Sequence, residues 1–266
     1  MRRAGAVLAL LTFLGTTVPA EAGLADRIGA TFAFMIEEFV KAFEPQEGMV
    51  VAVEGNTVFI DLGEERGAQS GQEFVVFRKG TAFRHQVTGR VLGRYETVLG
   101  HARVRRVSPQ FSETEFVARP DAPGPRPEDG VRISRGRIRV AITPLLDLTG
   151  GTADVRRVPY LFASILEHSK RFQVVDPFAV TDMFASGEVR VEEVLARPAR
   201  ATRMARNLDV TGWIIPVLLE RRGSMFLDVT YISAVTGAAL LSRRRPLIAE
   251  SVGEEQRFPW EPLIED

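Results

Sequence analysis

Cysteine is absent from this chain of 266 residues. Its absence excludes disulfide bonds, thiol nucleophiles and the lipid attachment that bacterial lipoproteins carry on a cysteine. Histidine is also scarce, and the three residues His85, His101 and His168 show no pair at metal-ligand spacing on one helix face. The sequence therefore predicts neither a lipoprotein nor a metal site.

An excess of one charge is lacking too, because 34 Lys and Arg residues balance 34 Asp and Glu residues. This balance gives no reason to expect nucleic acid as a partner. The phosphate-binding patterns GxGxxG and GxxxxGK[ST] and the hydrolase pattern GxSxG do not occur. We therefore expect no cofactor and no enzymatic activity.

The first 22 residues have the three parts of a signal peptide. Arg2 and Arg3 precede the apolar stretch AGAVLALLTFLG, and AEA at 20–22 is a small-x-small cleavage site. No later apolar run is long enough to cross a bilayer. We predict export to the periplasm with cleavage after about Ala22.

Apolar residues recur at helical spacing over residues 24–44, which predicts an amphipathic helix. Its apolar stripe includes Phe32, Ile36, Phe39 and Phe43. One interpretation is that the stripe packs on its own domain or on a symmetry mate. The other is that it binds a partner, although its polar face is not basic enough for a membrane surface.

Residues 47–118 alternate apolar and polar side chains, and glycines divide them at short intervals. This pattern predicts short strands in a small all-β barrel or sandwich, with Gly55-Asn56 as a hairpin turn. The prolines of RPDAPGPRPEDG, at 119–130, favour an extended path. We expect residues 119–136 to form a linker.

The sequence pattern is different in residues 137–249, which begin with the apolar strand pattern RIRVAITPLL. The order of expected elements, β-α-β-α-α-β-β-β, indicates an α/β domain with a mixed sheet. Residues 250–266 follow as an acidic tail. The predicted fold class is thus two-domain: an amino-terminal amphipathic helix, a small β-barrel or sandwich, then an α/β domain.

Two features of the second half are candidate binding sites. Asp147 follows the first strand, where loops of α/β sheets gather ligands, although Asp-Leu-Thr-Gly-Gly is also ordinary turn chemistry. Arg243, Arg244 and Arg245 form a basic cluster. The cluster fits either an acidic partner surface or the protection of a sheet edge.

Several motifs carry a resemblance to known envelope proteins. GMVVAVEGNTVFIDLG, GAQSG, EFVVFRKG and QVTGRVLG, between 48 and 117, resemble the carboxy-terminal domain of flagellar assembly protein T. VAITPLLDLTGG, RFQVVD and LDVTGWIIPVLL, within 137–248, are similar to the α/β domain of its middle region, of the TolB amino-terminal domain and of the CsgG-like curli family. The domain order is reversed relative to flagellar assembly protein T.

The resemblance implies a non-enzymatic envelope protein that acts through protein–protein contacts. We expect a role in assembly, in the ring around the flagellar basal body, with other envelope proteins or further copies of the chain as partners. Two alternatives stay open. The first is a TolB- or curli-type secretion accessory or a peptidoglycan-synthase activator, and the second is a periplasmic hydrolase with dispersed site residues.

Overall fold

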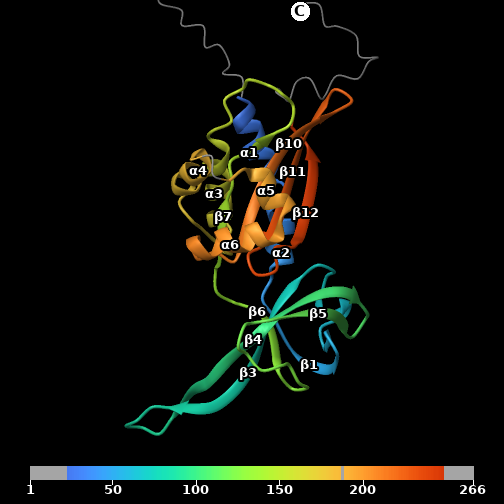
Figure 1. The fold of residues 1–266 in the computed structure, drawn as a ribbon, viewed down its shortest axis with the longest axis vertical. Helices are drawn as coiled ribbons and strands as arrows, with labels where there is room; N and C mark the ends of the chain where they lie inside the picture. The colour runs from blue at the N-terminus through green and yellow to red at the C-terminus, as the bar shows by residue number, and fades with distance from the viewer. Residues whose placement is uncertain (1–22, 187–188, 249–266) are drawn as a thin grey trace, which may run out of the picture.

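The computed structural model describes residues 23–186 and 189–248. They form a β-barrel and an α/β body, which follow one another along the long axis of the molecule (Figure 1). Within these ranges no helix has the length and hydropathy needed to cross a bilayer. The predicted signal peptide, 1–22, and the acidic tail, 250–266, lie outside the described residues.

In the described chain, six antiparallel strands close the barrel in the order β1-β2-β5-β4-β3-β6. Alternate side chains point inward because successive residues of a strand face opposite sides, and Phe74, Val76 and Leu99 are among those in the core. Gly55 has φ +60° in the β1–β2 turn, as the hairpin prediction requires. The strands are β1 Gln46–Glu54, β2 Thr57–Ile60, β3 Glu73–Arg84, β4 Val91–Val107, β5 Ser112–Ala118 and β6 Gly130–Ile133.

The strand β6 corrects the predicted linker at 119–136. It closes the barrel by pairing with β1 on one side and β3 on the other. A strand of four residues is too short to show alternation beside four prolines, so the sequence pattern hid it. Gly130 allows the close approach, since a Cβ there would lie 2.4 Å from Cζ of Phe77.

The α/β body contains a mixed sheet, as predicted. Its strand order is β12-β11-β10-β7-β9, with the short β8 beside β10. β7 runs parallel to β9 and β10, whereas β11 is antiparallel to both of its neighbours, β10 and β12. The bounds are β7 Ile138–Ile142, β8 Leu146–Asp147, α3 Val158–His168, β9 Phe172–Val174, α4 Pro177–Ala185, α5 Val191–Ala196, α6 Pro198–Leu208, β10 Gly212–Arg221, β11 Ser224–Ser233 and β12 Ala239–Pro246.

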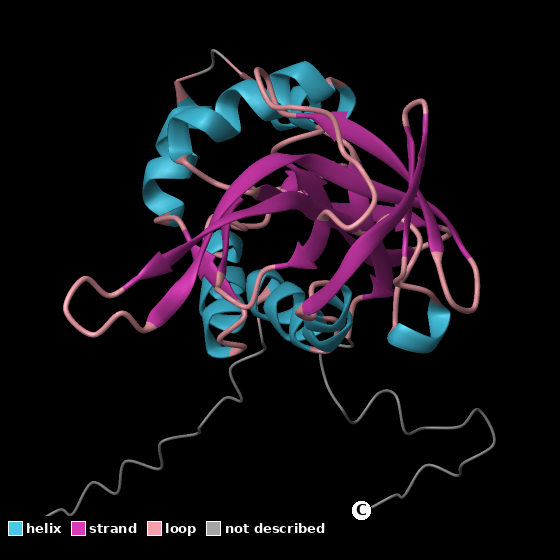
Figure 2. Cartoon of the chain, turned by 90° about the horizontal axis from the view of Figure 1, so that it is seen from below, coloured by secondary structure: helices cyan, strands magenta, loops and turns pink. Residues whose placement is uncertain are grey.

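Helices cover both faces of this sheet (Figure 2). Ile214 of β10 belongs to the core beneath α3, and its neighbour Trp213 belongs to the core beneath α4, α5 and α6. A strand buried on both faces reads as a continuous apolar run, which is why WIIPVLL shows no alternation.

The amino-terminal segment is two helices, α1 Leu24–Ala33 and α2 Ile36–Ala42, rather than one helix over 24–44. Its apolar stripe lies in the core of the α/β body. Phe32 stacks on Phe162 of α3 with ring centroids 3.9 Å apart, and Phe39 and Phe43 are buried beside it. The packing on its own domain, one of the two interpretations of the stripe, is the one that the structure shows.

The burial of α1 and α2 changes the domain organisation. The α/β body begins with these helices, is interrupted by the whole barrel, and resumes at β7. The barrel is therefore inserted into the α/β body instead of preceding it. Local sequence patterns could not reveal this, because they do not show which sheet a helix covers.

The longest strands of the barrel, β3 and β4, extend beyond it as a two-stranded arm (Figure 1, lower left). β3 has 12 residues and β4 has 17, against the short strands predicted. The pairing of β3 with β6 ends at Phe77, and that of β4 with β5 begins at Gly100. We call residues 79–97 the arm.

Candidate interaction surface

The arm displays large apolar side chains that the barrel core does not cover. At the tip, the side chain of Val87 is 88% exposed, and on β4 Tyr95 is 61% exposed. Phe83 contacts Tyr95 edge-on, with ring centroids 5.7 Å apart, so two aromatic rings share one face of the ribbon. Exposed aromatic clusters are enriched at protein interfaces. The exposed apolar residues of the arm are Phe83, Val87, Val91, Leu92 and Tyr95.

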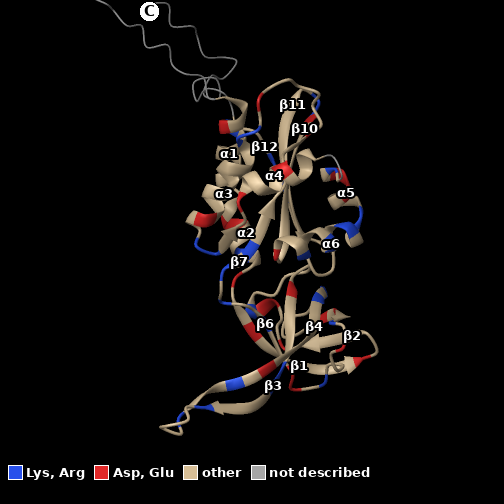
Figure 3. Cartoon of the chain, turned by 60° about the vertical axis from the view of Figure 1, so that its left-hand side comes forward, with Lys and Arg blue, Asp and Glu red and all other residues tan. Residues whose placement is uncertain are grey.

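The outer part of the arm is basic as well as apolar. Residues 80–95 contain Arg84, Arg90 and Arg94 and no Asp or Glu. Within the described residues, no carboxylate forms an ion pair with these three arginines. Figure 3 shows the basic positions along the arm and acidic positions where it meets the barrel. The combination fits a partner that is both apolar and acidic.

Ion pairs hold the base of the arm on the barrel. Arg132 of β6 donates to Glu96 at 2.7 Å, and Lys79 lies 3.5 Å from Glu47 of β1. The guanidinium of Arg132 also lies over the Phe77 ring, 4.1 Å from its centroid. The arm therefore leaves the barrel from a fixed base, while its outer strand edges have no neighbouring strand among the described residues.

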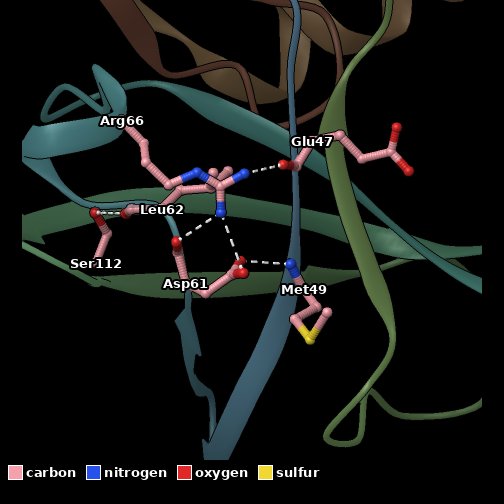
Figure 4. Close-up of polar contacts among 6 residues, drawn as sticks. All are labelled: Glu47, Met49, Asp61, Leu62, Arg66 and Ser112. Carbon is pink, nitrogen blue, oxygen red and sulfur yellow. Dashed lines mark hydrogen bonds and ion pairs between the residues drawn. The ribbon is translucent and has the colours of Figure 1, made fainter.

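A polar cluster joins β1 to the segment that follows β2 (Figure 4). Asp61 accepts a hydrogen bond from the backbone nitrogen of Met49 at 2.6 Å and pairs with Arg66 at 3.1 Å. Arg66 also donates to the Glu47 carbonyl at 2.6 Å. Every partner in this cluster belongs to the barrel segment of the chain.

A buried arginine fixes the barrel to the α/β body. Arg171 donates to the carbonyl oxygens of Phe43, Ser134 and Gly136 at 2.6 to 2.7 Å. Burial lowers the pKa of its guanidinium from the usual value. Across the same junction, Glu73 of β3 accepts hydrogen bonds from Ser233 and Thr236.

A cavity of about 280 Å³ lies at this junction. His101, Glu73 and Tyr231 are among its lining residues. Desolvation lowers the pKa of His101 and raises that of Tyr231, so both side chains favour their neutral forms. Within the described residues, no three His, Asp or Glu side chains group as metal ligands.

The candidate Asp147 lies at the end of β8, on the predicted edge of the sheet. Its Oδ1 accepts hydrogen bonds from the backbone nitrogen and the hydroxyl of Thr149, at 2.8 and 2.7 Å. This is an Asx turn, which favours the turn interpretation over a ligand site.

The arginine cluster on β12 is largely paired within the chain. Arg243 and Arg245 both bind Glu38 of α2, and Arg244 binds Asp228 of the neighbouring strand β11. The Arg245 and Arg243 hydrogen bonds lower the pKa of Glu38. Arg243 and Arg245 therefore join α2 to the edge strand β12, whereas Arg244 joins β12 to β11.

The predicted stripe residues do not form a surface. Phe32, Phe39 and Phe43 are buried, and Ile36 is partly buried against the same core. The structure thus corrects their assignment as interaction residues, because they cover the sheet of their own body. None of the predicted candidates lies on the arm.

Sequence reasoning missed the arm although two signals were available. The segment GTAFRHQVTGRVLGRY has no acidic residue, and its apolar residues continue past the length that a small barrel needs. Its glycines suggested turns between separate short strands. The pairing of strands decides which residues of β3 and β4 lie in the barrel and which extend beyond it. The alternation of apolar and polar residues in the sequence does not show this pairing.

Comparisons with known proteins give limited likenesses. No family model matches the chain. An uncharacterized protein of Aquifex aeolicus (strain VF5) is 33% identical over 107 residues, which cover 40% of this chain and 21% of that protein. The chain therefore spans about a fifth of the length of this relative.

Two similar solved structures share little sequence identity with this chain. The LpoB C-terminal domain from Salmonella enterica has 12% identity and a TM-score of 0.36, covering 43% of this chain and 84% of that one. Lipoprotein GNA1162 from Neisseria meningitidis has 11% identity and a TM-score of 0.35, covering 41% and 78%. At these scores the likeness carries no argument about function. None of these matches is named as a flagellar assembly protein, and the expected flagellar role is left without support.

Proposed function

We propose that this chain is a non-enzymatic, exported protein of the cell envelope that assembles with other proteins through the β3–β4 arm. One observation carries the proposal: an arm on which exposed aromatic and aliphatic side chains are grouped projects from the barrel. Apolar side chains grouped on a projecting element mark interaction sites in soluble proteins. The signal-peptide pattern of residues 1–22 supports export.

Contacts within the rest of the molecule hold the arm in one position, which supports this role. The barrel closes on itself, the Arg171 and Glu73 contacts join it to the α/β body, and the charged pairs at Glu96 and Lys79 fix the base of the arm. A binding element on a fixed base loses little conformational entropy when it meets its partner.

Site-specific crosslinking in cells tests the proposal. A photoreactive amino acid replaces Val87 at the arm tip, and a control replaces Phe178, which is 66% exposed on α4 of the α/β body. We expect a discrete adduct with an envelope protein from position 87 that position 178 does not give. The same adducts from both positions, or adducts with cytoplasmic proteins alone, would contradict the proposal.

The identity of the adduct also separates the more specific roles. A basal-body component would restore the flagellar role, and a secretion protein or a peptidoglycan synthase would select the corresponding accessory role. An adduct with twice the mass of the chain would identify a second copy as the partner.

A further inference from the structure

The exposed apolar and basic side chains of the arm are complementary to an extended segment that is both apolar and acidic. The chain itself contains such a segment in residues 249–266. This segment has six acidic residues and a single Arg, and its apolar residues include Phe258, Trp260, Leu263 and Ile264. Its charge and composition complement those of the arm, where residues 80–95 have three Arg and no acid.

We propose that the arm of one copy binds residues 249–266 of a second copy, so that the chain assembles head to tail. This inference rests on the proposed function and names its partner. The sequence PWEP at 259–262 has the PxxP spacing of extended peptides that dock on aromatic surfaces. The paired rings of Phe83 and Tyr95 provide such a surface on the arm.

The position where the described chain ends favours a second copy over the same molecule. The backbone nitrogen of Ile248 donates to Thr31 of α1, and α1 lies at the end of the molecule opposite the arm (Figure 1). In Figure 1 the whole α/β body and the barrel lie between α1 and the arm, so a segment that starts beside α1 would have to pass along both to reach the arm of its own molecule. The 18 residues of 249–266 span at most about 65 Å when fully extended.

Head-to-tail contact has a geometric consequence. The two surfaces differ, so the contact is heterologous, and a pair of copies keeps one free arm and one free tail. Repeated contacts then build a closed ring or an open filament, depending on whether the rotation between copies closes.

Two variants of the full chain test the inference. The arm variant carries Phe83→Ser and Tyr95→Ser, and the tail variant carries Pro259→Ser, Trp260→Ala and Pro262→Ser. A control carries Phe34→Ser and Phe178→Ser, two phenylalanines of the α/β body that are 72% and 66% exposed. Each protein is expressed with its own amino-terminal segment, and its mass distribution is measured by sedimentation over a range of concentrations.

We expect the unaltered chain and the control to self-associate, and each of the other variants to associate at least about tenfold more weakly. An equal mixture of the arm variant and the tail variant should form a 1:1 dimer and nothing larger, because it retains one intact arm and one intact tail per pair. Higher salt should weaken every association, since the charges involved are exposed.

Other results would overturn the inference. They are a monomeric unaltered chain, a tail variant that associates normally, and a mixture that forms no dimer. Circular dichroism of each variant shows whether a loss of association reflects loss of the fold. If the tail variant associates normally while the arm at position 87 still crosslinks to another envelope protein, the head-to-tail inference fails and the proposed function stands.

Discussion

Arg171 donates from Nε to the carbonyl oxygen of Phe43 at 2.7 Å, although 128 residues separate them in the sequence. Its other nitrogens donate to the carbonyls of Ser134 and Gly136. Phe43 precedes the barrel and Ser134 follows it. One guanidinium therefore contacts both chain segments that connect the barrel to the α/β body. The direction of the arm depends on this junction.

Replacing Arg171 with Met should destabilise the protein by about 3 kcal/mol, because three carbonyl groups at the junction lose their charged donor. Urea unfolding of the variant and the unaltered chain measures the difference. Arg221→Met, an exposed substitution at the end of β10, serves as the control and should leave the midpoint nearly unchanged. Equal midpoints for the two variants would show that the junction does not depend on Arg171.

Gly48→Ala should also destabilise the barrel, by about 2 kcal/mol. An added Cβ would lie 2.3 Å from Oδ1 of Asp61 and 2.8 Å from Cγ of Leu62, so the polar cluster of Figure 4 would have to move. The matched control is Gly93→Ala on the arm, where a Cβ meets no atom within 4 Å. Thermal unfolding measures the stability of both variants. If Gly48→Ala were as stable as Gly93→Ala, the close packing around Gly48 would be contradicted.

The attachment of α2 should weaken in acid. The Arg245 and Arg243 contacts lower the pKa of Glu38 below its ordinary value of 4.5 in the folded state. The stabilisation is therefore present above pH 4.5 and is lost as the pH falls through the lowered pKa. Because Glu38 is partly exposed, Glu38→Gln should cost about 1 kcal/mol or less at pH 7, and less again at pH 3. Urea unfolding at both values tests this, and an equal cost at each pH would refute the ion-pair explanation.

Reversing the charges of the arm should leave the fold intact. Arg84→Glu, Arg90→Glu and Arg94→Glu together remove no ion pair of the described structure, so the free energy of unfolding should change by less than about 1 kcal/mol. Chemical unfolding measures it. A larger loss would mean that the arm stabilises the molecule and is not primarily a binding element.

Much of the α/β body follows from local pattern. Its mixed sheet was predictable because WIIPVLL and the helical stripe of α3 are strong, local signals, whereas the two-residue strand β8 and the division of α5 from α6 were not part of the predicted order. The stripe of α1 and α2 was also correct as a helical face. Its partner was not predictable, since Phe32 meets Phe162 across the inserted barrel, 130 residues later.

The candidate surface was harder to predict than the fold. Arg243 and Arg245 were predicted as part of a basic binding cluster. In the structure both form ion pairs with Glu38, a residue distant in sequence. Tyr95 and Val87 gave no such signal, because an apolar residue in a strand pattern is ordinarily buried. They are exposed because the pairing of β3 with β6 ends at Phe77 and that of β4 with β5 begins only at Gly100.

The central claim is that the arm carries the function, and one measurement in cells tests it most directly. A strain that lacks the chain receives either the arm variant R84E/R90E/R94E or the control R203E/R206E/R221E, which changes the net charge equally at exposed positions of α6 and β10. Immunoblots first establish equal export. We predict that the control restores the unaltered phenotype and that the arm variant reproduces the deletion. Full rescue by the arm variant would contradict the account.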